Sequence, residues 1–205
     1  MKKILFINIY LLLFFTSYAQ KGNDNLFKEY EDTLQVIFNK IINGNTEEEK
    51  REANQAFIRN LNEVLEYEKS FKYSFSSLPS DLILTSPDNT FRIFNWLLQK
   101  DNKSYEYYGI IHYYNKNIKR YEIIPLVDNS KNIRNPKQEL LDANNWYGCV
   151  YYEIVYIKKK GRKFYTLIGW DGNNIFSTKK IIDVMYFSGK NKVKFGLPIF
   201  KNNLK

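Results

Sequence analysis

A group of basic side chains in the second half of the chain is the first set of residues that could bind a ligand. Five positive charges surround a single glycine: Lys158, Lys159, Lys160, Arg162 and Lys163. Lysine and arginine attract phosphate, sulfate and carboxylate groups, so the cluster is suited to an anionic glycan or envelope polymer. The alternative is a solvated hairpin tip, where lysines protect strand edges from aggregation. The sequence leaves both interpretations open.

A second candidate is the run from Gly169 to Asn174, which reads Gly-Trp-Asp-Gly-Asn-Asn. Its Asp and Asn side chains can cap their own backbone and its glycines permit positive φ, so a turn explains most of it. A turn does not explain the tryptophan, and we therefore add Trp170 and Asp171 to the candidate ligand-binding residues. Asp171 and Asn173 carry oxygens that could bind calcium, but the EF-hand pattern is not met. No metal site is predicted.

Acidic residues offer the main route to catalysis. Glu122, Glu153, Asp171 and Asp183 all fall in or beside predicted β-segments. Two carboxylates facing each other across a cleft could hydrolyse a glycoside, with a separation that sets the stereochemistry. The alternative is that each ends a strand or pairs with a lysine. Glu153, Asp171 and Asp183 are the first candidates for such a carboxylate-dependent, glycosidase-like hydrolase.

Histidine and cysteine each occur once, as His112 and Cys149. This excludes sites built on two or three histidines and the common structural zinc sets. The Walker A, GxSxG, HExxH and GxGxxG patterns are absent from the sequence. The remaining nucleophilic arrangement is Cys149 with His112 and Asp171, which requires all three to meet. We expect a hydrogen-bonded strand histidine and a buried thiol instead, and we assign no catalytic residue and no cofactor.

These candidates lie on a chain rich in β-type segments. Aromatic and β-branched residues favour pleated, half-buried surfaces, and turn residues separate the segments as in antiparallel hairpins. The predicted strands are 91–96, 105–114, 119–127, 150–158, 163–170, 181–187 and 192–200, the last four forming a meander. Segment 105–114 is apolar on both faces and is expected at the centre of its sheet. Pro198 predicts an edge position for the last strand, and Asn135-Pro136 predicts a short helix through Leu141.

Residues 24–69 carry the apolar spacing of two amphipathic helices. Asp24 is the expected N-cap of the first helix, and Gly44 is the glycine expected to end it. Thr46 and Glu49 form a capping box at the start of the second helix. The polar face is acidic, which argues against an interfacial membrane helix. The predicted fold class is therefore α+β, an N-terminal helical hairpin packed on an antiparallel β-meander sheet.

The N-terminus has the features of a secretory signal peptide. Lys2 and Lys3 precede the apolar run 4–15, and Ser17-Tyr18-Ala19 fits the small-x-small cleavage rule. The apolar run is too short to span a bilayer. We therefore expect cleavage after Ala19 and export to the periplasm or out of the cell, with no transmembrane helix afterwards.

The expected organisation is a signal peptide (1–19), a helical hairpin (20–70) and a β-rich region (71–205) that forms one globular unit with the hairpin. The chain ends soon after the last predicted strand, which leaves open that a longer natural protein continues there. The net charge of +9 is uneven: residues 20–70 carry seven basic and eleven acidic side chains, whereas residues 71–205 carry twenty-two basic and eleven acidic. The two parts could face different partners.

Several runs carry a family resemblance: Ser86-Pro87-Asp88-Asn89 leading into 91–96, Tyr151-Tyr152-Glu153-Ile154, 169–173 and Ile182-Asp183-Val184. Together they resemble an uncharacterised family of exported bacterial proteins with a helical N-terminus and a β-rich remainder. The resemblance covers most of the mature chain and implies no catalytic residues, because the family has no assigned activity.

Three functions remain in view. The leading hypothesis is a non-enzymatic binding or structural module of the envelope or secreted fraction. The alternatives are the carboxylate-dependent hydrolase and a domain that binds a protein partner through the acidic hairpin. Nucleic acid is not expected as a partner, because exported proteins rarely meet it.

Overall fold

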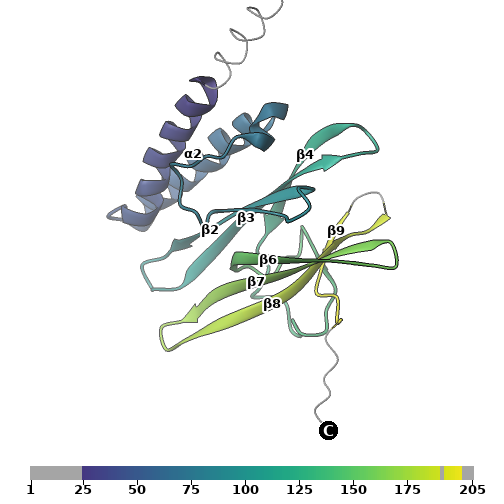
Figure 1. The fold of residues 1–205 in the computed structure, drawn as a ribbon. Helices are drawn as coiled ribbons and strands as arrows, with labels where there is room; N and C mark the ends of the chain where they lie inside the picture. Colours follow the sequence, from purple (N-terminus) through teal and green to yellow (C-terminus); the bar gives the residue numbers. More distant parts are fainter. Residues whose placement is uncertain (1–24, 190–191, 200–205) are drawn as a thin grey trace, which may run out of the picture.

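A computed structural model describes residues 25–189 and 192–199 of the chain (Figure 1). The predicted signal peptide, residues 1–19, and the predicted N-cap Asp24 lie outside these ranges. None of the helices within them is both long and apolar enough to cross a bilayer.

The fold is α+β, as predicted, and it consists of a helical layer and two antiparallel sheets (Figure 1). The helical layer comprises residues 25–43, α2 (Glu47–Leu65) and the short 3-10 helix η1 (Glu68–Lys72). The first sheet has the order β1-β2-β3-β4, formed by β1 (Ile83–Thr85), β2 (Phe91–Gln99), β3 (Tyr105–Asn115) and β4 (Arg120–Val127). The second has the order β5-β9-β8-β7-β6, formed by β5 (Leu141–Asp142), β6 (Val150–Lys159), β7 (Arg162–Asn174), β8 (Ser177–Phe187) and β9 (Val193–Phe195).

The start of α2 follows the predicted capping pattern. The backbone N–H of Glu49 donates to Thr46 Oγ1 at 3.1 Å, and the Glu49 carboxylate accepts from the backbone N–H of Asn45 at 2.9 Å. These contacts satisfy N–H groups that the first helical turn leaves without intrahelical partners. The helix therefore begins where the sequence predicts it.

Strand β2 contributes to both hydrophobic cores because successive side chains point to opposite faces of a sheet. Phe94 and Trp96 pack against the helical hairpin, whereas Phe91 and Ile93 pack against the second sheet. Trp96 also donates its indole N–H to Asn54 of α2 at 2.7 Å. Strand β3 lies between β2 and β4, which confirms the central position predicted from its two apolar faces.

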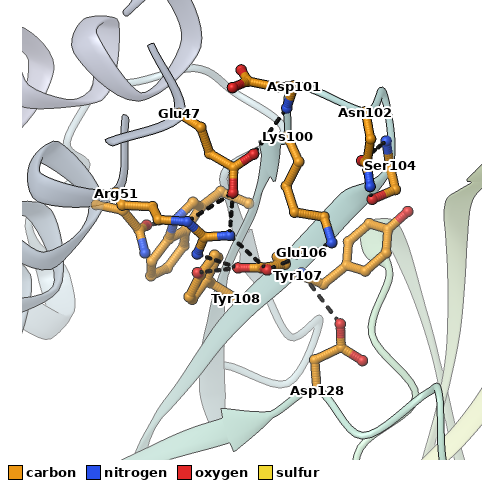
Figure 2. A network of polar contacts seen from close by, with 12 residues as sticks. Glu47, Arg51, Lys100, Asp101, Asn102, Ser104, Glu106, Tyr107, Tyr108 and Asp128 are labelled. Atoms are coloured by element: carbon orange, nitrogen blue, oxygen red, sulfur yellow. Dashed lines mark hydrogen bonds and ion pairs between the residues drawn. The ribbon is translucent and has the colours of Figure 1, made fainter. Parts of the chain in front are cut away.

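Arg51 of α2 fastens the helical hairpin to the first sheet (Figure 2). Its guanidinium donates to both carboxylate oxygens of Glu106 on β3, at 2.8 and 2.9 Å, and to Glu47 at 2.6 and 3.0 Å. Glu47 also accepts the backbone N–H of Asp101, in the turn between β2 and β3, at 2.9 Å. Because a two-pronged contact fixes orientation as well as distance, Arg51 helps to set the angle of α2 against the sheet.

Three local predictions are corrected by the structure. Strand β9 is not an edge strand, because β5 pairs with its free side, and Pro198 follows the strand instead of interrupting its ladder. Residues 136–138 form a turn and not a helix, and Leu141 begins β5. The run Gly169–Asn174 belongs to β7, and the turn that follows it consists of Ile175 and Phe176.

Candidate functional site

The basic cluster occupies the tip of the β6–β7 hairpin, as predicted. Lys160 and Gly161 form the two-residue turn, with φ of 49° and 76°. Positive φ at both central positions is the requirement of the turn that matches the twist of a hairpin. The register places Lys158 opposite Lys163 and Lys159 opposite Arg162. Like charges that face each other across a ladder destabilise it, so the tip carries an electrostatic cost within the fold.

Lys163 differs from its neighbours because it has a structural partner. Its ammonium group lies 2.6 Å from Asp88 Oδ2 and 3.0 Å from Thr90 Oγ1, in the turn that precedes β2. Lys158, Lys159, Lys160 and Arg162 are exposed, and none of them forms an ion pair with a residue in the described ranges. Four of the five predicted basic residues are therefore available to an external anion.

A groove of about 670 Å³ lies against the hairpin tip. Arg162 and Lys163 line one side, and Lys116 of the β3–β4 turn lines another. Figure 1 shows that the β3–β4 and β6–β7 turns lie on the same side of the molecule. The half-buried rings that line the groove are Tyr114, Phe164, Tyr186 and Phe187. Basic side chains and aromatic rings thus line the same groove.

The β3–β4 turn extends the positive surface. Lys116, Lys119 and Arg120 are exposed there, and nothing in the sequence pattern predicts that they lie beside the hairpin tip. The acidic groups in this region are held in internal contacts. Burial raises the pKa of Asp88, but hydrogen bonds from Lys163, Thr90, Ser86 and Tyr165 outweigh it and lower the pKa to about 2. Glu122 accepts hydrogen bonds from Tyr113 and Asn115, which lower its pKa.

Trp170 and Asp171 lie elsewhere. They sit near the opposite end of β7, about 30 Å from the hairpin tip for an extended strand. Asp171 is buried, and it accepts hydrogen bonds from the hydroxyls of Tyr107 and Tyr147, each at 2.9 Å, with Lys179 Nζ at 3.5 Å. The ring of Trp170 makes an edge contact with Tyr105. The structure therefore does not bring these two residues together with the basic cluster.

The carboxylates considered for hydrolysis are not arranged as a facing pair. Asp183 is buried and accepts from the Tyr151 hydroxyl at 2.9 Å and from two backbone N–H groups, of Val184 and Gly196. Burial raises its pKa. Glu153 is exposed and pairs with Ile168, on the outer face of the sheet, whereas Asp171 is buried toward its inner face. Glu153 and Asp171 therefore do not face each other across a cleft.

The cysteine and the histidine lie on opposite sides of the first sheet. Cys149 is in the core between the two sheets, where burial raises the pKa of its thiol. His112 lies opposite Arg92 on the helix-covered face and packs against Phe71 and Tyr121. Its imidazole makes no hydrogen bond to any described residue, so the expected hydrogen-bonded strand histidine is also corrected. The arrangement of Cys149, His112 and Asp171 does not form.

Sequence reasoning missed Arg92. Its side chain is 4% exposed and lines a separate cavity of about 740 Å³, bounded by η1, the segment that follows it and β1. The available signal was its position: Arg92 shares a strand face with Phe94 and Trp96, both apolar. A charge in an apolar row requires a special partner or a function.

No protein-family model, curated protein or solved structure matches this chain at a significant level. Within the described ranges, no three His, Cys, Asp or Glu side chains gather closely enough to hold a metal ion.

Proposed function

We propose that this chain is an exported binding module that holds an anionic polymer, such as an acidic glycan of the cell envelope, at the β6–β7 hairpin tip and the groove beside it. The main supporting observation is a groove with aromatic walls that Arg162 lines, next to three more exposed lysines of the hairpin tip. None of these four basic side chains forms an ion pair with a residue in the described ranges. Charged groups would attract the polymer, and aromatic rings would offer flat apolar surfaces to sugar rings.

The electrostatics of the hairpin tip favour this proposal over simple solvation. Lysines that only protect an edge need not face another cation, yet Lys159 faces Arg162, and neither forms an ion pair with a described residue. An anion bound beside this pair would convert the repulsion into attraction, so the fold would become more stable when the polymer binds. Arrangements that lower stability without a structural benefit are expected mainly at functional sites.

The test is retention on an immobilised polyanion over a salt series. Heparin–agarose serves as a sulfated probe and immobilised polygalacturonate as a carboxylated one. A variant with Lys158, Lys159 and Lys160 replaced by Gln should elute earlier, with a log–log salt slope reduced by about two to three. The matched control replaces Lys40, Lys131 and Lys137 by Gln, because these are exposed lysines away from the groove and remove the same charge.

Equal retention of the two triple variants would mean that net charge alone governs binding, and the proposed surface would be rejected. Export is tested separately by the intact mass of the protein recovered from the producing cells. Loss of residues 1–19 supports cleavage after Ala19, whereas an intact N-terminus contradicts it.

A further inference from the structure

Arg92 has an environment that is unusual for a buried cation. Its guanidinium carbon lies 5.6, 5.4 and 4.9 Å from the ring centroids of Phe71, Phe75 and Phe94. One terminal nitrogen, Nη1, donates to the backbone carbonyl of Tyr73 at 2.6 Å. Ring faces attract a cation, but they do not replace the hydrogen bonds that its N–H groups make in water.

The guanidinium has no counter-ion among the residues that the structure describes. Its Nε and Nη2 atoms are buried and have no hydrogen-bond acceptor among the described residues, and no ion pair in that part of the chain includes Arg92. Burial lowers its pKa to about 10. A buried charge without a partner destabilises a fold substantially, so its retention needs a reason.

The cavity beside Arg92 has the complementary chemistry for an anion. Its polar lining includes Lys72, Ser74, Ser76, Ser80, Thr85 and Asn89. No Asp or Glu from the described ranges lines it. Its volume of about 740 Å³ falls within the range of small-molecule sites. The cavity is thus cationic, rich in hydroxyl groups and bordered by the rings of Phe71 and Tyr121.

The wall of the cavity also holds a strained residue. Phe75 has φ of 50°, in the left-handed region that bulky side chains rarely adopt, and it is 1% exposed. Such a conformation persists only when the surroundings hold it in place. The Tyr73–Ser80 segment, which has no regular secondary structure, therefore lies beside Arg92 with one residue in a strained conformation.

We propose that this cavity binds a small molecule in which a carboxylate or phosphate is attached to a hydroxylated body of sugar size. The oxyanion pairs with the guanidinium of Arg92, whose fork of N–H donors matches two oxygens, and Lys72 adds a second positive charge. The serine and threonine hydroxyls bind the body of the ligand. Because Nε and Nη2 are covered, the Tyr73–Ser80 segment shifts as the ligand enters.

This site is independent of the polymer-binding groove, with which it shares no lining residue. Arg92 belongs to the helix-covered face of the first sheet, whereas the groove lies at the turns on one side of the molecule. A variant that no longer binds a small molecule in the cavity can therefore still be tested for polymer binding, and the reverse also holds.

The experiment is a titration of the ¹⁵N-labelled full chain with glucuronate, glucose 6-phosphate and, as the uncharged reference, glucose. We expect saturable shifts of the Arg92 Nε–Hε signal and of the amides of Tyr73–Ser80 with at least one anionic sugar and not with glucose. A carboxylate-only or phosphate-only response identifies the source of the oxyanion. The Arg92→Met variant should bind at least about tenfold more weakly, because it removes a charge-assisted pair.

Arg59→Met is the matched control, since Arg59 is an exposed arginine of α2 without an ion pair in the described ranges. It should bind as the wild type does. No shift with either anion up to tens of millimolar, an equal shift with glucose, or unchanged binding by Arg92→Met would each overturn the proposal. Should Arg92→Met fail to fold, the shifts of the wild-type protein still decide between these outcomes.

Discussion

Arg92 and His112 lie directly opposite each other on β2 and β3, and both are buried on the face that the helical layer covers. The imidazole packs edge-on against Phe71, with ring centroids 5.3 Å apart, and neither of its nitrogens meets a hydrogen-bond partner among the described residues. Burial, aided by the positive charge of Arg92, lowers the pKa of His112 to about 3. The imidazole is therefore neutral wherever the protein is folded at ordinary pH.

This relationship predicts a loss of stability in mild acid. The unfolded chain binds a proton at His112 near pH 6.5, whereas the folded chain does not until about pH 3. The stabilisation is thus complete above pH 6.5 and is lost as the pH falls toward 3. One proton gives a slope of about 1.4 kcal/mol per pH unit, or about 2 kcal/mol between pH 6.5 and pH 5.

Urea unfolding at pH values from 8 to 5 measures this loss, in a window where most carboxylates stay ionised. His112→Phe should flatten the profile, because it removes the titrating group and keeps a ring between Phe71 and Tyr121. The chain has one histidine, so a single imidazole NMR signal reports on it directly. Titration of that signal in the folded protein near pH 6.5 would contradict the prediction.

The contact between Arg51 and Glu106 predicts a second, more acidic transition. Hydrogen bonds from Arg51 lower the pKa of Glu106 to about 2. Its contribution to stability is present above the unfolded value near 4.5 and is lost as the pH falls toward 2. Because Arg51 is partly exposed, we expect Glu106→Gln to lower the free energy of unfolding by only about 1 kcal/mol at pH 7.

Glu52→Gln is the matched control for Glu106→Gln. Glu52 is an exposed residue of α2 next to Arg51, and its loss should change the free energy of unfolding very little. Chemical denaturation of both variants at pH 7 and pH 3 measures the difference. Glu106→Gln should be the less stable variant at pH 7, and the gap should narrow at pH 3. Equal effects of the two substitutions would show that Arg51 does not fasten the helical hairpin to the sheet.

Tyr107 and Asp171 join the two sheets through the core. The Tyr107 hydroxyl donates to Asp171 at 2.9 Å and accepts the backbone N–H of Gly172 at 2.7 Å. Tyr107→Phe leaves both groups buried without that partner, so we expect a loss of about 2 kcal/mol in the free energy of unfolding. Tyr152→Phe serves as the control, because Tyr152 is 41% exposed. A neutral Tyr107→Phe would argue that water replaces the hydroxyl.

Local features of the fold followed from the sequence, because they depend on nearby residues. The Thr46 cap, the Lys160-Gly161 turn and the two apolar faces of β3 are all encoded within a few positions. Insertion of β9 between β5 and β8, by contrast, depends on residues about fifty positions apart, and a strand's pattern defines its faces but not its neighbours. The same limit applies to the site. The basic hairpin tip was predicted from the sequence. The position of Lys116 beside it and the burial of Arg92 depend on strand pairing, which the sequence pattern does not reveal.

The ion pair with Asp88 gives Lys163 a structural role, unlike the other four residues of the basic cluster. Lys163 connects β7 to the turn before β2, and Asp88 keeps a low pKa there. Lys163→Gln should therefore lower the free energy of unfolding by about 1 kcal/mol, with a small effect on polyanion retention. Denaturation and heparin retention are measured on the same preparation. A large loss of retention with unchanged stability would place Lys163 in the binding surface instead.

For Lys159 we predict the opposite combination: a substitution that raises stability and weakens polyanion retention. It faces Arg162 across the β6–β7 ladder, so Lys159→Glu replaces a repulsive pair by an attractive one. We expect the free energy of unfolding to rise by about 0.5 kcal/mol, because cross-strand pairs of opposite charge stabilise a hairpin. The same substitution reverses a charge at the proposed polymer-binding surface, so elution from heparin should move to lower salt.

Lys159→Gln is the intermediate case and should give about half of each change. A gain in stability together with a loss of retention would indicate that the cationic pair lowers the stability of the fold and contributes to polymer binding. A gain in stability with unchanged retention would mean that the cationic pairs have no part in holding a polymer, and the binding surface would then have to be sought in the groove alone. Unchanged stability would show that solvent screens the pair, which removes the electrostatic argument for the hairpin tip.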